Sequence, residues 1–181
     1  MPILITSTYI ALLLISFAIG LIVGMEKTVS TKEVIKFSFI TALIFGLFSF
    51  AGIGIGNLFG KWDIKYMGAL LVLAAGFTTV TKGGKSNAFI FSLDAHNTKY
   101  FVFANIAVGL SVMLATFGLN LFWQISLLYP ALFFIIAFLF TMTGIWCGKK
   151  INTIKTIKIF LILSGIILFL VGLTMFILTW K

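Results

Sequence analysis

Charged residues divide this chain into six apolar stretches of about membrane-spanning length. These stretches cover residues 5–24, 37–60, 66–81, 101–123, 130–148 and 159–180. A helix rises about 1.5 Å per residue, so about 20 apolar residues cross roughly 30 Å of hydrocarbon. Of the 181 residues, 61% are hydrophobic and only 9% are charged, whereas about a quarter of a soluble domain is charged. The sequence predicts an all-α, polytopic membrane protein with six transmembrane helices in a single domain, 1–181.

Composition excludes several other classes of protein. The single cysteine, Cys147, leaves no disulfide scaffold and no redox pair within the chain. The net charge of +9 comes from lysines at the edges of apolar stretches, which is typical of membrane proteins and argues against nucleic acid as a partner. Residues 1–25 carry no charge. Without a basic start or a small-residue cleavage site, this first stretch is interpreted as a retained helix and not as a signal peptide.

The lysines indicate an orientation for the six helices. The first, third and fifth loops hold ten lysines, whereas the opposite side holds three, Lys61, Lys65 and Lys181. Lysine is enriched on the cytoplasmic side of membrane proteins. We therefore expect both termini outside the cytoplasm, in the plasma (inner) membrane of a prokaryote. The aromatic residues at span ends on the outer side are Trp62, Trp123, Tyr129 and Trp180, as an interfacial aromatic belt would place them.

The two halves of the chain match each other at a nearly constant offset. Residues 10–14 match residues 106–110, and Gly76 matches Gly172, both at an offset of 96. The pattern Gly-x-x-x-Gly at 52–56 recurs at 144–148, at an offset of 92. These matches predict one three-helix repeat over about 5–81, a cytoplasmic loop over about 82–100, and a second repeat over about 101–180. An odd number of spans per repeat makes the repeats inverted, an arrangement that many secondary transporters share.

Glycines gather at one end of the second and fifth predicted spans. Gly52, Gly56 and Gly60 lie on one helix face, as do Gly144 and Gly148. Small residues at this spacing allow helix backbones to approach closely in lipid. Helix packing is the expected role, and a glycine-lined path is the alternative.

The six spans in two repeats, the Leu-Ile-Phe-Gly run from Leu43 to Gly46 and the glycine-rich ends of two spans resemble the bacterial manganese efflux pumps. The related sporulation membrane protein family, in the same LysE-type transporter superfamily, is similar too. The resemblance covers nearly the whole chain. It implies a six-helix transporter fold with both termini outside the cytoplasm.

The same resemblance implies an aspartate in the first helix of each repeat. At the matching positions this chain has Ile15 and Ser111, which are again 96 residues apart. Ser49 lies where some members have an acidic residue in the second span. The text Ser92-Leu93-Asp94-Ala95 imitates the motif, but in a membrane helix it would bring His96 and Lys99 into the hydrocarbon, which is costly. Asp94 is therefore interpreted as a loop residue, with a shifted register in which it is the ion site as the alternative.

No predicted span contains Asp, Glu, His, Lys or Arg in its interior. A divalent cation prefers carboxylate, imidazole or carbonyl ligands, and proton coupling needs a titratable group at depth. We therefore expect no metal site, no cofactor and no enzymatic activity. Polar side chains remain at Ser16, Asn105 and Asn120. They either satisfy themselves within the helices or form a polar path for a neutral or monovalent solute.

Two functions remain open from the sequence. The first is a protein of manganese-efflux-pump-like fold that is not a divalent-cation pump and transports another solute. The second is a non-transporting subunit that anchors or stabilises a larger membrane protein complex, in which case membrane protein partners join the lipid bilayer. A homo-oligomer is compatible with both.

Overall fold

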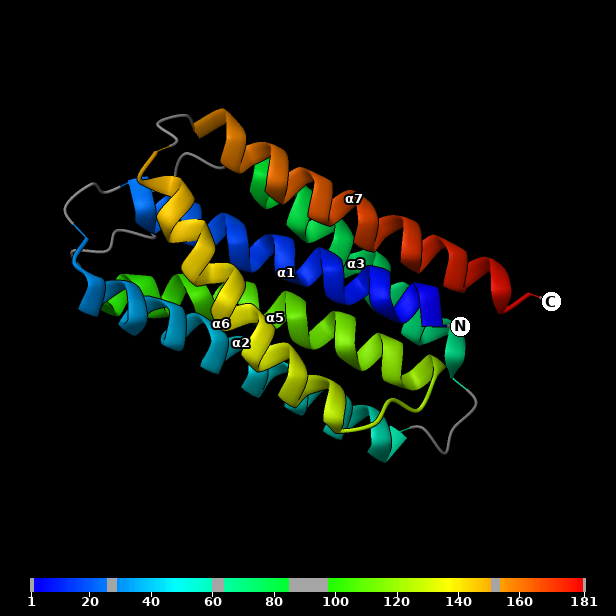
Figure 1. Ribbon diagram of the computed structural model, residues 1–181. Coiled ribbons are helices and arrows are strands. Elements are labelled where there is room, and N and C mark those ends of the chain that lie inside the picture. The colour runs from blue at the N-terminus through cyan, green and yellow to red at the C-terminus, as the bar shows by residue number, and fades with distance from the viewer. Residues whose placement is uncertain (1, 26–28, 60–63, 85–97, 151–153, 181) are drawn as a thin grey trace.

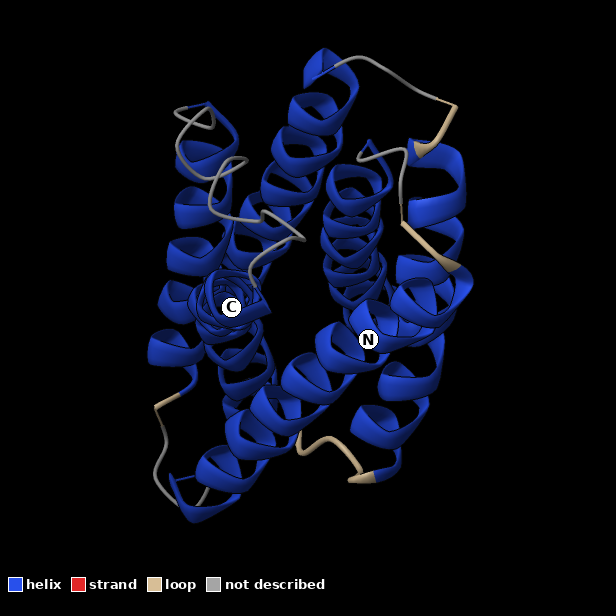
Figure 2. Ribbon diagram, turned by 90° about the vertical axis from the view of Figure 1, so that its left-hand side faces the viewer, coloured by secondary structure: helices blue, strands red, loops and turns tan. Residues whose placement is uncertain are grey.

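The computed structural model describes residues 2–25, 29–59, 64–84, 98–150 and 154–180. Its helices are α1 (Pro2–Met25), α2 (Thr31–Phe59), α3 (Lys65–Gly84), α5 (Thr98–Phe122), α6 (Leu128–Gly148) and α7 (Ile154–Leu178), as Figure 1 shows. Over these residues the secondary structure is helical without strands, as Figure 2 shows. The predicted all-α class is confirmed.

Five of these described helices, α1, α2, α5, α6 and α7, are long and apolar enough to cross a membrane. Helix α3 is apolar over a shorter stretch, Lys65–Thr81, and it packs along α7. Long apolar helices in this number are diagnostic of a multi-pass membrane protein.

Helix α2 begins six residues before the apolar stretch that predicted it. Its first turn is closed by a capping box, in which the Ser30 backbone N–H donates to Glu33 Oε2 at 2.7 Å and the Glu33 N–H donates to Ser30 Oγ at 3.3 Å. These bonds satisfy N–H groups that the start of a helix leaves free. Pro130 lies in the first turn of α6, where a missing N–H removes no helical bond.

The six described helices form a closed cycle of neighbours. Helix α1 packs against α6 and α7, α5 packs against α2 and α3, and the cycle closes through the pairs α2–α6 and α3–α7. Helices α1 and α5 lie nearest the middle, and they supply many of the fully buried side chains. The side chains of Phe37, Phe45 and Phe101 are the largest that are completely enclosed.

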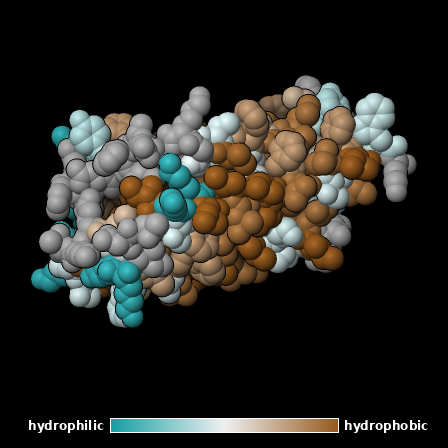
Figure 3. All heavy atoms as spheres, turned by 90° about the horizontal axis from the view of Figure 1, so that it is seen from above, coloured by the Kyte–Doolittle hydropathy of each residue, from teal (hydrophilic) through white to brown (hydrophobic). Residues whose placement is uncertain are grey.

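The two ends of the bundle differ in charge. Hydrophilic residues gather at one end and apolar residues cover the middle, as Figure 3 shows. Lysines at this end bind across helices: Lys36 Nζ donates to Thr98 Oγ1 at 3.1 Å, and Lys149 Nζ donates to the Val29 carbonyl at 2.8 Å. Both termini lie at the opposite end (Figure 1). We call the two the lysine end and the termini end.

Candidate functional site

The glycines of α6 lie where α6 crosses α1. A Cβ built on Gly144 would collide with the Phe17 carbonyl oxygen and lie 3.1 Å from Gly20 Cα. One turn further, a Cβ on Gly148 would lie 2.9 Å from Gly24 Cα. The two backbones are therefore in direct contact at this crossing, which only residues without a side chain permit.

The glycines of α2 lie where α2 crosses α5. A Cβ on Gly52 would lie 2.6 Å from the Met113 carbonyl oxygen and would also collide with Thr116 Oγ1. A Cβ on Gly56 would lie 2.7 Å from Asn120 Nδ2. In the structure these glycines therefore lie against partner helices, while Gly60 lies outside the described residues.

The three positions that the resemblance assigns to acidic residues have different surroundings. Ile15 is buried in the main hydrophobic cluster. The Ser111 hydroxyl lies 3.5 Å from Thr78 Oγ1 of α3. The Ser49 hydroxyl is fully buried and close to the Tyr9 hydroxyl, yet neither atom has a hydrogen-bond partner at bonding geometry.

The described part of the chain has no group of three or more His, Cys, Asp or Glu side chains that would hold a metal ion. Asp94 and the rest of its motif lie outside the described residues, so the alternative register stays untested. The three positions that the resemblance assigns to acidic residues offer hydroxyl oxygen or no polar atom.

Two of the three polar-path residues are engaged in structural hydrogen bonds. Ser16 Oγ donates to the Leu12 carbonyl of its own helix at 3.4 Å. Asn120 Nδ2 donates to the Ile53 carbonyl at 3.0 Å and to Asn57 Oδ1 at 2.8 Å. Its Oδ1 accepts the Ile125 N–H at 2.6 Å. Asn120 thus ties α2, α5 and the α5–α6 connection together.

Asn105 is different because its side-chain amide oxygen accepts no hydrogen bond. Its Nδ2 donates to the Phe101 carbonyl at 2.9 Å, which fixes the orientation of the amide, and its buried Oδ1 has no partner. The other buried side-chain oxygens without a partner in the described helices belong to Tyr9, Ser38, Thr41 and Ser49.

The candidate residues drawn from the sequence did not include Tyr9, Ser38 or Thr41. The repeat offset carried a signal for Tyr9, because Tyr9 lies 96 residues before Asn105. No comparable sequence signal marks Thr41, whose role depends on how α2 packs against α5. The polar path through Ser16, Asn105 and Asn120 therefore stays a prediction.

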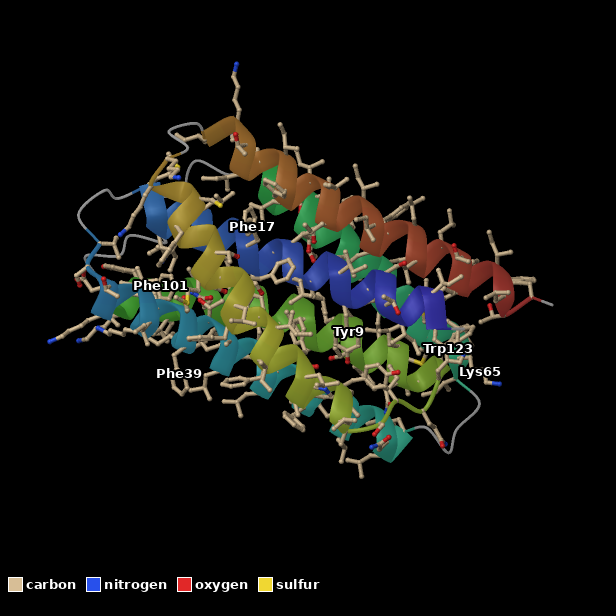
Figure 4. All side chains as sticks on the ribbon, in the orientation of Figure 1. Tyr9, Phe17, Phe39, Lys65, Phe101 and Trp123 are labelled. Atoms are coloured by element: carbon tan, nitrogen blue, oxygen red, sulfur yellow. The ribbon has the colours of Figure 1, made fainter. Side chains whose placement is uncertain are left out.

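The termini end carries a recess of ≈ 750 Å³ between α3, α5 and α7. Lys65, Trp123 and Trp180 are among its lining residues, and Figure 4 shows Lys65 and Trp123 close to this end of the bundle. The two tryptophans therefore lie together at the termini end, beside Lys65, and the aromatic belt stays a prediction.

The chain is similar to a protein named as a manganese efflux pump. This relative, "Putative manganese efflux pump MntP 1" of Clostridium botulinum (strain Langeland / NCTC 10281 / Type F), is 28% identical over 176 residues, which are 92% of this chain and 93% of the relative. No family profile and no solved structure matches the chain.

The similarity supports the resemblance drawn from the Leu43–Gly46 run and from the glycine-rich span ends. Because it extends over nearly the full length of both proteins, it concerns the whole bundle and not a local motif. The chain is a helical membrane protein that is similar over nearly its whole length to a protein named as a manganese efflux pump. A relative named as a transporter also agrees with the expectation that the chain is not an enzyme.

Proposed function

We propose that the helices form two inverted three-helix repeats, α1–α3 and α5–α7. The neighbour relations support this, because exchanging α1, α2 and α3 with α5, α6 and α7 reproduces the same cycle of packed pairs. Under this exchange the packed pair α1–α6 corresponds to the packed pair α5–α2, and α1–α7 corresponds to α5–α3. The pairs α2–α6 and α3–α7 each correspond to themselves.

The observation that carries this proposal is the register of the two glycine crossings. Gly144 faces the Phe17 carbonyl, and Gly52 faces the Met113 carbonyl. Phe17 of α1 and Met113 of α5 are 96 residues apart, and Gly52 of α2 and Gly144 of α6 are 92 residues apart. These are the two offsets found in the sequence. The partners Gly24 of Gly148 and Asn120 of Gly56 obey the same rule.

The third helix of each repeat follows the same relation. A Cβ on Gly76 would lie 2.5 Å from the Phe169 nitrogen, and a Cβ on Gly172 would lie 2.6 Å from the Leu73 nitrogen. Gly76 and Gly172 differ by 96, as do Leu73 and Phe169. The α3–α7 pair is therefore also self-complementary, which supports α3 as the sixth span.

The proposed function follows from this fold and from the chemistry at its centre. The chain is a six-span protein of the manganese-efflux-pump type that does not pump divalent cations and carries a different, weakly held solute. Stripping a divalent ion of its water requires compensating charge or several oxygen ligands. Ile15, Ser49 and Ser111 supply at most two hydroxyls in place of the family's carboxylates.

The proposed orientation places the lysine end in the cytoplasm and both termini outside, in a prokaryotic plasma membrane. The described lysines support this orientation. Seven of them lie at the starts of α2, α5 and α7 and at the end of α6: Lys32, Lys36, Lys99, Lys149, Lys150, Lys155 and Lys158. Among the described residues the opposite end has Lys65 alone.

A second candidate is a non-transporting subunit that anchors a membrane complex. The observation that favours it is Ile15, an apolar residue buried in the main hydrophobic cluster at a position where the family has its ion ligand. This candidate predicts a stoichiometric membrane partner, and cross-linked native purification with mass spectrometry would detect it. A chain that purifies alone would favour transport.

Growth under manganese stress tests the proposed function in cells. A bacterium that lacks its own manganese exporter should remain manganese-sensitive when it expresses the wild-type chain, because the carboxylates are missing. A verified exporter of the same family is the positive control, and membrane expression of both is measured by immunoblot. Rescue by the wild-type chain would contradict the proposal.

A further inference from the structure

Three buried hydroxyls of α2 make no hydrogen bond, not even to the backbone of their own helix. Buried serines and threonines in a membrane helix ordinarily donate to the carbonyl three or four residues earlier. Thr8, Thr79 and Thr141 do so, at 2.8 to 2.9 Å. The hydroxyls of Ser38, Thr41 and Ser49 are fully buried and have no partner.

The packing register brings Asn105 opposite Thr41. On α2 and α5, which run in the same direction, the rings of Phe37 and Phe101 meet edge to face with centroids 4.7 Å apart, and Gly56 faces Asn120. Both pairs differ by 64, so the residue opposite Thr41 is Asn105. Since Ser38 lies one turn from Thr41 on the same buried face, one level of the bundle gathers Ser38 Oγ, Thr41 Oγ1 and Asn105 Oδ1. We call these three residues the lysine-side cluster.

A second polar level lies nearer the termini end. It consists of the hydroxyls of Ser49 on α2 and Tyr9 on α1, which we call the termini-side cluster; Figure 4 shows Tyr9 within the bundle. Phe45 lies on α2 midway between Thr41 and Ser49, is completely buried, and stacks on Phe133 at 6.4 Å. An aromatic pair therefore separates the two clusters.

The chemistry of the two clusters limits what binds there. Every atom without a partner here is an uncharged oxygen, and the segments that carry these atoms, residues 37–59 of α2, 100–122 of α5 and 2–25 of α1, contain no acidic or basic residue. Three such oxygens at one level and two at the other do not replace the water of a cation in a low-dielectric interior. These oxygens are suited to an uncharged molecule that donates and accepts two to four hydrogen bonds in total.

We propose that Ser38, Thr41 and Asn105 form a binding site for a small uncharged hydrogen-bonding molecule, with Tyr9 and Ser49 as a second station beyond Phe45. The occupant is either water or an organic solute of the same chemistry, such as a small amide or polyol. As the substrate class of the proposed transporter, this inference rests on the transport function, but occupancy of the site is measurable without transport.

The first test is the sign of a stability change in the purified chain. If the lysine-side cluster is empty, Thr41→Val removes an unpaired hydroxyl and raises Tm; if it is occupied, Thr41→Val breaks a hydrogen bond and lowers Tm by about 2–4 °C. Thr41→Ser should keep the wild-type Tm within about 1 °C. Thr79→Val, which removes a hydroxyl bonded within its own helix, is the matched control. A raised Tm, or a change equal to that of the control, overturns the proposal.

The second readout excludes a direct bond between Thr41 and Asn105. X-ray radiolysis converts bound water into hydroxyl radicals, so mass spectrometry should find oxidised Phe45 in wild type and less of it in Thr41→Val. Met175, equally buried in an apolar cluster, should stay unlabelled. A lowered Tm without labelling of Phe45 and without any Tm increase in acetamide or glycerol would mean that the two side chains bond each other, and it would overturn the proposal.

The remaining arms identify the occupant and separate this inference from the transport function. A Tm increase with acetamide or glycerol that is larger in wild type than in Thr41→Val identifies an organic solute, and equal increases identify water. Vesicles with the wild-type chain are then compared with empty vesicles by stopped-flow light scattering. An occupied site with no added permeability leaves the binding site standing and contradicts transport.

Discussion

Gly24 and Gly148 meet backbone to backbone where α1 crosses α6: a Cβ on either residue would lie 2.9 Å from the Cα of the other. The corresponding contact in the other half joins Gly56 to the side chain of Asn120. At this level the α1–α6 crossing is a backbone contact between two glycines. The α2–α5 crossing has the hydrogen bonds of Asn120 in the same place. Within the proposed repeat, the two halves share a geometry but differ in how it is held.

Substitution of Gly148 by valine should destabilise the bundle by at least about 1–3 kcal/mol, since the added atoms overlap the α1 backbone. The measurement is Tm in detergent, with retention of a monodisperse species on size-exclusion chromatography. Gly54→Ala is the matched control, because a Cβ at Gly54 has no heavy atom within 4 Å. Equal stability of the two variants would show that the α1–α6 crossing is looser than described.

Asn120→Ala should cost about 1–3 kcal/mol because it removes both donor bonds to α2 and leaves the buried Ile125 N–H unpaired. Asn57→Ala, which removes only one partner of Asn120, should cost less. Thermal unfolding of both variants gives the comparison. A larger loss for Asn57→Ala would contradict the role of Asn120 as the link between α2, α5 and the α5–α6 connection.

The orientation proposal predicts which end of the bundle is accessible from outside the cell. In a Cys147→Ser background, cysteine at Thr179 should react with a membrane-impermeant maleimide in intact cells. Cysteine at Lys155, at the lysine end, should react only after permeabilisation. The reverse pattern would place the termini in the cytoplasm and contradict the lysine bias as the determinant of topology.

Much of the fold follows from the position of the charged residues, because they interrupt an otherwise apolar chain. The apolar stretches locate all six described helices. The start of α2 was placed too late, since Lys32, Glu33 and Lys36 are polar yet helical. A hydropathy pattern does not include these polar residues in the helix, although the capping box of Ser30 and Glu33 is visible in the sequence.

The polar residues were harder to assign because their roles depend on which helix faces them. In the sequence, Ser16 and Asn120 look as available for binding as Asn105. In the structure, however, Ser16 donates to its own helix and Asn120 donates to a neighbouring helix. The free Oδ1 of Asn105 becomes apparent only once Phe101 is seen to accept its Nδ2. Tertiary packing, and not residue type, therefore separates the candidate site from structural hydrogen bonds.

The central claim is that the fold of a manganese efflux pump is retained without its divalent-cation site. Labelled Mn²⁺ flux into proteoliposomes tests it most directly, with wild type compared with the double variant Ile15→Asp/Ser111→Asp and with Ser126→Asp as an exposed control. The account predicts flux at the level of empty liposomes for wild type and the control, and measurable flux for the double variant if it folds. Saturable Mn²⁺ flux through the wild-type chain would contradict the account.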